Sequence, residues 1–199
     1  KLMSIMAALE DGVVDLDDMI DTGDGTVTYY DKTIRDHDNK GLGVITVQQV
    51  FENSSNVGTA KIICENYKKN PRRFVDRLYA MRLNRPLDLQ IKGEGQPLIR
   101  YPGDKLWSGI SLAMMAHGYE VHLTPLQILT FYNAVANNGK MVKPRFVTEI
   151  RDGSRVLKRF GTEVISNSIC SRSTIRKAKK MLEGVVENGT AMNLKNNNY

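Results

Sequence analysis

The sequence lacks the residues and runs that mark several common classes of protein. Its 199 residues include two cysteines, Cys64 and Cys170, which lie far apart and form neither a zinc-ligand spacing nor a disulfide framework. We expect both to be buried as small apolar side chains. No run of about 18 apolar residues is present, so no segment is expected to span a membrane, and no signal peptide is visible.

Motifs for nucleotides and metals are also missing. The sequence has neither a glycine-rich phosphate loop nor the dinucleotide fingerprint, and strands and helices do not alternate regularly. His117 and His122 flank Glu120, but their spacing does not place them on one face of a zinc-binding helix. The aspartates from Asp15 to Asp24 lack the closing glutamate of a calcium loop. The sequence therefore predicts no metal and no cofactor.

The excess of positive charge gathers in two places. The net charge is +6 and the isoelectric point is about 9.3. The basic residues are Lys68, Lys69, Arg72, Arg73 and Arg77, and then Arg172, Arg176, Lys177, Lys179 and Lys180. Acidic residues are interspersed, and no aromatic residues interleave with the second cluster. We therefore predict solvated helix faces and no nucleic-acid partner. A mildly basic surface could also suit an anionic membrane or wall polymer.

Length and composition indicate an ordinary soluble globular domain. Hydrophobic residues make up 41% of the chain and charged residues 25%, and the length suits one domain or one domain with a small lobe. The chain begins with Lys1-Leu2-Met3 inside an apolar pattern and ends in an asparagine-rich tail. We expect both ends to be cuts through a longer protein.

Helices are predicted to predominate. Residues Leu2 to Leu9 are apolar on nearly every face, which is typical of a buried helix, and Asp11-Gly12 should end it. Capping boxes at Thr46 and Thr124 predict helices that run to Asn53 and Asn138. Further helices are expected over residues 57–67, over residues 71–82 behind an Asn70 cap, and from Ser173 to Asn188.

The remaining segments suggest short strands and one long loop. Residues 13–39 should form short strands and loops around the β-prone residues 26–30, and residues 145–150 and 155–160 should pair as a hairpin. Leu83 to Gly109 is a long irregular connection, and such loops often border a cleft. Trp107 at its end is expected to anchor the loop rather than bind a ligand.

The triplet Ser54-Ser55-Asn56 carries the most chemistry. Serine and asparagine often end one helix and cap the next, so the triplet alone is most simply an inter-helix turn. It also presents a hydroxyl, which can pass a proton, close to a carboxamide, which can both donate to and accept from an amide substrate. The sequence around it favours the second interpretation.

Taken together, these residues resemble the transpeptidase domain of class B penicillin-binding proteins. Three motifs define that family: Ser-x-x-Lys, Ser-x-Asn and Lys-Thr-Gly. Ser54-Ser55-Asn56 matches the second motif, and Lys1 before an apolar helix looks like the lysine of the first. The supporting segments are Val57–Ile62, Gly118-Tyr119 before Leu123–Gln127, Ala136–Gly139 with Lys143-Pro144, and Leu182–Val186 before Gly189-Thr190-Ala191.

The chain departs from the family in lacking two complete motifs. It contains no Ser-x-x-Lys and no Lys-Thr-Gly. Residues 1–199 are therefore expected to be a partial transpeptidase domain, an internal fragment between those motifs. The resemblance implies an α/β fold of the α+β type: the mostly helical part of the serine β-lactamase/transpeptidase-like fold, with few strands.

The resemblance also implies a chemistry. Lys1 would act as the base for a serine nucleophile, Ser54 would relay the proton to the leaving amine, and Asn56 would bind the substrate amide and orient Lys1. The substrate would be a D-Ala-D-Ala stem peptide of peptidoglycan, joined through an acyl-serine, and β-lactams would acylate the same serine. Cell-division or elongation proteins are possible partners. The expected location is the extracytoplasmic face of the bacterial membrane, with an anchor upstream.

Two alternatives stay open at this point. One is a β-lactamase or carboxypeptidase, and the other is a non-catalytic sensor or interaction domain on the same fold. For the structure, we expect Ser54-Ser55-Asn56 to join two helices, and Ser54 to lie between Lys1 and Asn56 in one cleft. Because no Ser-x-x-Lys is present, the chain itself should form no stable acyl-enzyme with penicillin.

Overall fold

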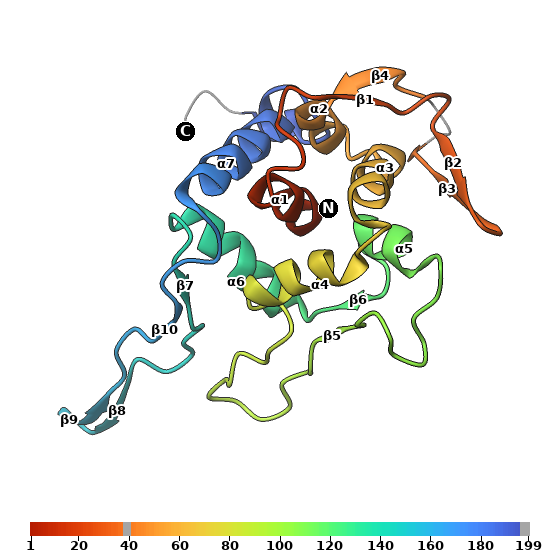
Figure 1. Cartoon of the computed structure of the whole chain (residues 1–199). Coiled ribbons are helices and arrows are strands. Elements are labelled where there is room, and N and C mark those ends of the chain that lie inside the picture. The colour runs from red at the N-terminus through yellow and green to blue at the C-terminus, as the bar shows by residue number, and fades with distance from the viewer. Residues whose placement is uncertain (38–40, 196–199) are drawn as a thin grey trace.

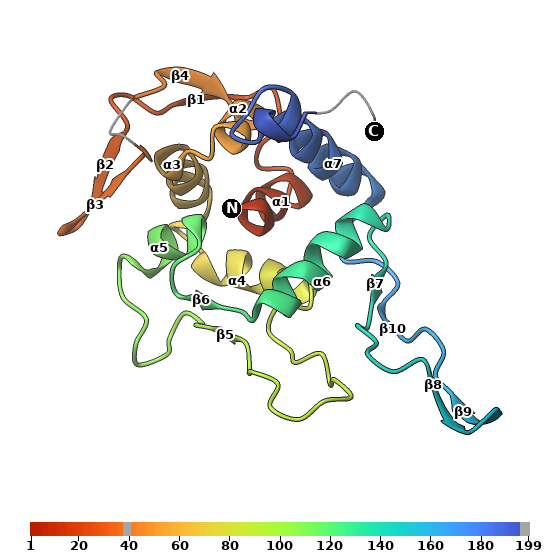
Figure 2. The same ribbon diagram turned by 180° about the vertical axis from the view of Figure 1, so that it is seen from behind.

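One apolar helix lies at the centre of a ring of other helices in the computed structural model, which describes residues 1–37 and 41–195. This helix, α1 (Leu2–Glu10), is seen nearly end-on in Figures 1 and 2. Ile5, Met6, Ala7 and Ala8 are fully buried. Helices surround α1 on several sides, which explains why apolar residues occur on nearly all its faces.

The surrounding helices share one continuous hydrophobic core with α1. Their largest buried side chains include Phe74, Phe131 and Met181, each less than 2% exposed. The helices are α2 (Val47–Glu52), α3 (Asn56–Tyr67), α4 (Pro71–Ala80), α5 (Ser111–His117), α6 (Pro125–Ala136) and α7 (Arg172–Glu187), and a 3-10 turn follows, η2 (Met192–Leu194). None of the helices in the described ranges is both long and apolar enough to cross a membrane.

Strands occur as antiparallel pairs at the rim. The pairs are β1 (Met19–Asp21) with β4 (Val44–Thr46), β2 (Thr26–Tyr29) with β3 (Lys32–Arg35), β5 (Leu98–Ile99) with β6 (Val121–His122), β7 (Met141–Val142) with β10 (Val164–Ser166), and β8 (Glu149–Asp152) with β9 (Arg155–Arg159). The β8–β9 hairpin projects away from the helices (Figure 1). Helices together with these short strand pairs confirm the predicted α+β character.

Local sequence signals located most helices correctly. Both capping boxes are present, at Thr46 and Thr124, and α1 is followed by Gly12 in the left-handed conformation, with φ of 65°. The 145–160 hairpin and the irregular 83–109 connection are also confirmed, although β5 lies within the latter. Cys64 and Cys170 are buried, as expected.

Two predictions about helix starts need correction, and one helix was not predicted. The last helix is capped by Ser171, whose Oγ accepts from the Thr174 amide, and not by Ser173. Asn70 precedes α4 but makes no side-chain cap hydrogen bond, so Pro71 alone carries the start signal. Helix α5 was not predicted, because it is short and Ile110 before it supplies no side-chain cap.

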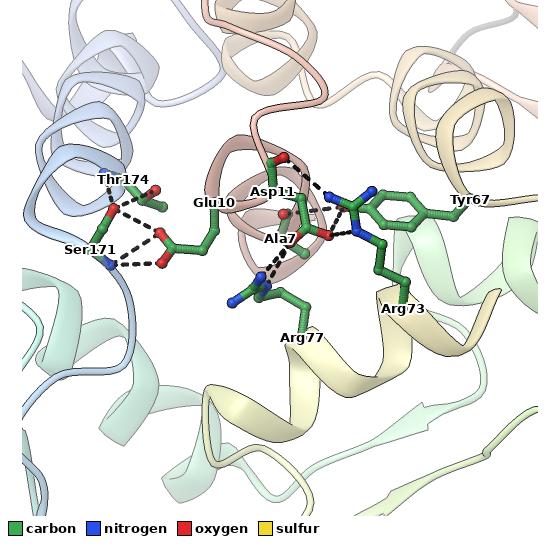
Figure 3. A network of polar contacts seen from close by, with 8 residues as sticks. All are labelled: Ala7, Glu10, Asp11, Tyr67, Arg73, Arg77, Ser171 and Thr174. Carbon is green, nitrogen blue, oxygen red and sulfur yellow. Dashed lines mark hydrogen bonds and ion pairs between the residues drawn. The ribbon is translucent and has the colours of Figure 1, made fainter. Parts of the chain in front are cut away.

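The C-terminal end of α1 is held by a buried carboxylate, Asp11 (Figure 3). Its side chain is 1% exposed, and it accepts a 2.8 Å hydrogen bond from the Tyr67 hydroxyl. Arg73 Nε lies 3.0 Å from it, and the Arg77 guanidinium also pairs with it. These two arginines keep part of their surface in solvent, with side chains 49% and 34% exposed, and they also pair with Asp11 and so bind α4 to α1.

Glu10 links the same end of α1 to the start of α7 (Figure 3). Its carboxylate accepts from the Ser171 amide at 3.0 Å and from the Ser171 hydroxyl at 2.8 Å. Burial alone would raise the pKa of Glu10, but hydrogen bonds from Thr174 and Ser171 outweigh it and hold the pKa below the ordinary 4.5. A carboxylate at a helix N-terminus is also favoured by the helix dipole.

This contact predicts an acid-sensitive contribution to stability. Since the folded-state pKa of Glu10 is lowered, its stabilisation is present above the ordinary value of 4.5 and is lost as the pH falls through the folded-state pKa. Glu10→Gln should unfold at lower urea concentration than the wild type at pH 7, and the difference should shrink at acid pH. The control is Glu183→Gln, at an exposed position on α7. An equal difference at both pH values would contradict the assignment.

Candidate active site

The segment after α2 is a tight turn with a serine where glycine is usual. The Ser55 amide donates to the Val50 carbonyl at 2.9 Å, and the Ser54 amide donates to the Phe51 carbonyl at 3.0 Å. This is the Schellman pattern that ends many helices. Ser54 occupies its left-handed position, with φ of 55°. A side chain there costs about 1 kcal/mol, and strain of this kind clusters at functional sites.

Lys1 contacts this turn from the start of the central helix. Its Nζ donates to the Ser54 carbonyl at 2.7 Å and to Ser54 Oγ at 2.8 Å. Burial lowers the pKa of the Lys1 ammonium, and the negative charge of Asp36 opposes part of that shift. A lysine with a lowered pKa, directly bonded to a hydroxyl, can exchange a proton with it.

Ser55 and Asp36 fix the turn through hydrogen bonds at the start of α3. The Ser55 side chain, 1% exposed, caps α3 by accepting from the Gly58 amide at 2.8 Å, and it donates to Asp36 at 2.8 Å. The other Asp36 oxygen accepts from the amides of Asn56 at 2.5 Å and Val57 at 2.9 Å. A buried carboxylate therefore satisfies the first amides of α3, where the helix dipole favours negative charge.

Asn56 begins α3 and lines a neighbouring cavity. Its Nδ2 donates to the Arg35 carbonyl at 2.8 Å. The cavity has a volume of about 380 Å³ and is also lined by Met114, His117 and Tyr119. Burial lowers the pKa of His117; the hydrogen bond with the Ala113 carbonyl opposes this shift, and the positive charge of Lys1 adds to it.

The structure confirms one expectation about the triplet and part of another. Ser54-Ser55-Asn56 joins α2 to α3, and Ser54 lies in contact with Lys1. A single cleft shared by Lys1, Ser54 and Asn56 stays a prediction, because neither Lys1 nor Ser54 is among the residues that line the cavity beside Asn56. The position of Asn56 against a substrate, and its action on Lys1, stay predictions, because its amide is bonded to Arg35. No group of three or more His, Cys, Asp or Glu side chains within residues 1–37 and 41–195 could hold a metal ion.

Comparison with known proteins identifies the family of this chain. The family model described as the penicillin binding protein transpeptidase domain matches residues 1–199. The chain belongs to this transpeptidase family. It is 30% identical over 188 residues to the penicillin-binding protein PbpB of Mycolicibacterium smegmatis, covering 94% of this chain and 28% of that protein.

Two further similarities agree with this family. The peptidoglycan D,D-transpeptidase FtsI of Escherichia coli is 29% identical over 153 residues, covering 75% of this chain and 24% of FtsI. The crystal structure of penicillin-binding protein 3 from Mycobacterium tuberculosis, complexed with aztreonam, superposes with a TM-score of 0.74 and 26% identity, covering 93% of this chain and 40% of that one. The chain thus spans about a quarter of the length of these curated relatives.

Sequence reasoning missed two side chains that lie near the Ser54 turn or line the adjacent cavity. Asp36 lies 18 positions before Ser54 in an acidic, loop-rich segment, and nothing local distinguishes it from the exposed aspartates around it. The sequence suggests His117 only as a zinc-ligand candidate, whereas in the structure its Nδ1 contacts the Ala113 carbonyl at 2.8 Å and its ring centroid lies 5.2 Å from that of Tyr119. The role of Asp36 depends on contacts with residues 19 to 21 positions further along the chain, whereas these contacts of His117 are local.

The left-handed backbone conformation of Ser54 predicts which of two variants is the more stable. Ser54→Gly and Ser54→Ala both remove the hydroxyl and its bond to Lys1. Glycine adopts positive φ without strain and alanine does not, so Ser54→Gly should be the more stable by about 1 kcal/mol. Urea denaturation of the two variants measures the difference. Alanine proving equal to or more stable than glycine would show that the turn is not strained.

The buried hydrogen bonds of Asp36 predict that its removal lowers the stability of the fold by more than the substitutions of Ser54 differ. Asp36→Ala leaves the amides of Asn56 and Val57 and the Ser55 hydroxyl without their acceptor, which should cost about 2 kcal/mol or more. Asp31→Ala is the matched control, because that carboxylate is 77% exposed. Chemical denaturation of both variants compares them, and equal midpoints would contradict the role of Asp36 as a cap.

Proposed function

We propose that this chain is the part of a serine D,D-transpeptidase domain that lies between the Ser-x-x-Lys and Lys-Thr-Gly motifs. The observation that carries the proposal is the contact of Lys1 Nζ with Ser54 Oγ at 2.8 Å, at the end of a buried helix. The gene product containing this chain would cross-link peptidoglycan stem peptides that end in D-Ala-D-Ala.

In this proposal, Lys1 acts as the base for the serine of the first motif. A free hydroxyl is a poor nucleophile at neutral pH, and burial favours the neutral amine of Lys1, which can accept its proton. Attack on the D-Ala-D-Ala carbonyl forms the acyl-serine and breaks the peptide bond. The Ser54 hydroxyl, bonded to Lys1, passes the proton on to the leaving amine.

Asn56 would hold the substrate beside this pair. Its carboxamide lines the 380 Å³ cavity, where it can donate to and accept from a peptide amide. The existing bond to the Arg35 carbonyl would fix which way the amide group points. No step of this mechanism requires a metal or a cofactor.

The family also suggests the ligands and the location. The aztreonam complex of the Mycobacterium tuberculosis protein supports acylation of this site by β-lactams. Peptidoglycan lies outside the cytoplasmic membrane, so we propose an extracytoplasmic location with an anchor outside this chain. Division or elongation proteins would be the partners, as the similarity to PbpB and FtsI suggests.

Labelling with fluorescent penicillin tests the proposal. The gene product containing this chain should give a covalent band on denaturing electrophoresis, and Lys1→Ala and Ser54→Ala should slow labelling by orders of magnitude, as in other activated-serine enzymes. The 199-residue chain alone should give no band, because it contains no Ser-x-x-Lys.

Three outcomes would overturn all or part of this proposal. A band on the 199-residue chain that Ser54→Ala abolishes would make Ser54 the nucleophile. Rapid release of the label, with hydrolysis of the free β-lactam, would favour the β-lactamase alternative. Absence of labelling in the gene product would favour a non-catalytic domain.

A further inference from the structure

A second cavity, of about 270 Å³, lies between the β2–β3 hairpin, α3 and the loop before α5. Its walls carry three aromatic side chains: Tyr29, Tyr30 and Trp107. Lys68 and Ser108 supply an ammonium group and a hydroxyl at exposed positions among its lining residues. The mechanism proposed above uses none of these residues. The lining therefore combines aromatic faces with a few polar groups, as small-ligand sites do.

Tyr30 is held in an unusual way. It follows β2 with φ of 54°, a conformation that is strained for a tyrosine, and it is 78% exposed. A Cβ built on Gly109 would lie 2.5 Å from the Tyr30 ring, so the ring lies directly against the backbone of that glycine. The exposed ring of Tyr30 therefore connects the β2–β3 hairpin to the long loop before α5 and forms one wall of the cavity.

This lining suits a sugar ring better than a purely apolar ligand. The C–H face of a pyranose stacks on an aromatic ring, while its hydroxyl and acetamido groups at the ring edge need hydrogen-bonding partners. Tyr30 and Trp107 offer aromatic faces, and Lys68 and Ser108 offer donors.

The two cavities are neighbours across one short helix. Both are lined by α5 and by the β2–β3 hairpin, which Figure 1 shows on the same side of the helical ring. The seven residues of α5 span about 10 Å. A stem peptide of four residues can extend over roughly 13 Å. A sugar in the aromatic cavity could therefore place its peptide beside Asn56.

We propose that the cavity lined by Tyr30 and Trp107 binds an N-acetylated hexosamine of the glycan strand that carries the substrate peptide. The choice of peptidoglycan as the ligand rests on the proposed function. The cavity would position a polymeric substrate and contribute nothing to acylation by a small β-lactam.

The probe is chitotriose, the trimer of N-acetylglucosamine, titrated into the gene product containing this chain. Tyr30→Ala removes one stacking face, Gly109→Ala displaces the Tyr30 ring, and Lys68→Gln removes a charged donor. The first two variants should weaken the Kd about tenfold, and the third should weaken it less. Tyr132→Ala on α6 is the control, since Tyr132 is 39% exposed and lines neither cavity.

Fluorescent-penicillin labelling of the same samples separates the two proposals. Normal labelling of Tyr30→Ala, together with slower cross-linking of polymeric glycan, is the expected result and also shows that the variant is folded. Normal labelling with no chitotriose binding, or equal binding by Tyr30→Ala and Tyr132→Ala, overturns the sugar site alone. Chitotriose binding without any labelling overturns the proposed transpeptidase and leaves a carbohydrate site.

Discussion

Burial of α1 is the constraint on which the rest of the structure depends. An almost wholly apolar helix can be stable in water only if other elements cover it, and here the surrounding helices do so. Its two ends emerge from the core at polar contacts. Glu10 and Asp11 fix one end to α7, α3 and α4, and Lys1 meets the Ser54 turn at the other. The axial position of one helix therefore sets the position of the proposed base.

The proposed site combines a rigid foundation with local strain. Asp36 satisfies the first amides of α3, so the residues after Ser54 are firmly held. Ser54 itself adopts a conformation that glycine would adopt at less cost. A side chain kept at such a position is consistent with selection for its hydroxyl, because the turn alone would favour glycine. Stability and the proposed chemistry thus favour different residues at this position.

The hairpin that carries Arg35 and Asp36 serves the chain in more than one way. Arg35 orients the Asn56 carboxamide, and Asp36 caps α3. Tyr30, which follows the other strand of the hairpin, reaches the loop before α5. A two-stranded hairpin is marginally stable by itself. These contacts with α3 and with the long loop therefore hold it in place, and they connect the proposed catalytic turn to the proposed sugar site.

The sequence by itself determined the local elements and the key triplet. Capping boxes, the apolar pattern of residues 2–9 and the serine-asparagine turn act over a few residues, so they can be recognised without the fold. The family resemblance predicted that Ser54 lies beside Lys1, but only the tertiary structure decided that Asp36 accepts from the first amides of α3 and that Arg73 and Arg77 pair with Asp11. These contacts join residues that are distant in sequence. Which residues meet is set by how the helices pack around α1, and a local sequence pattern does not predict that packing.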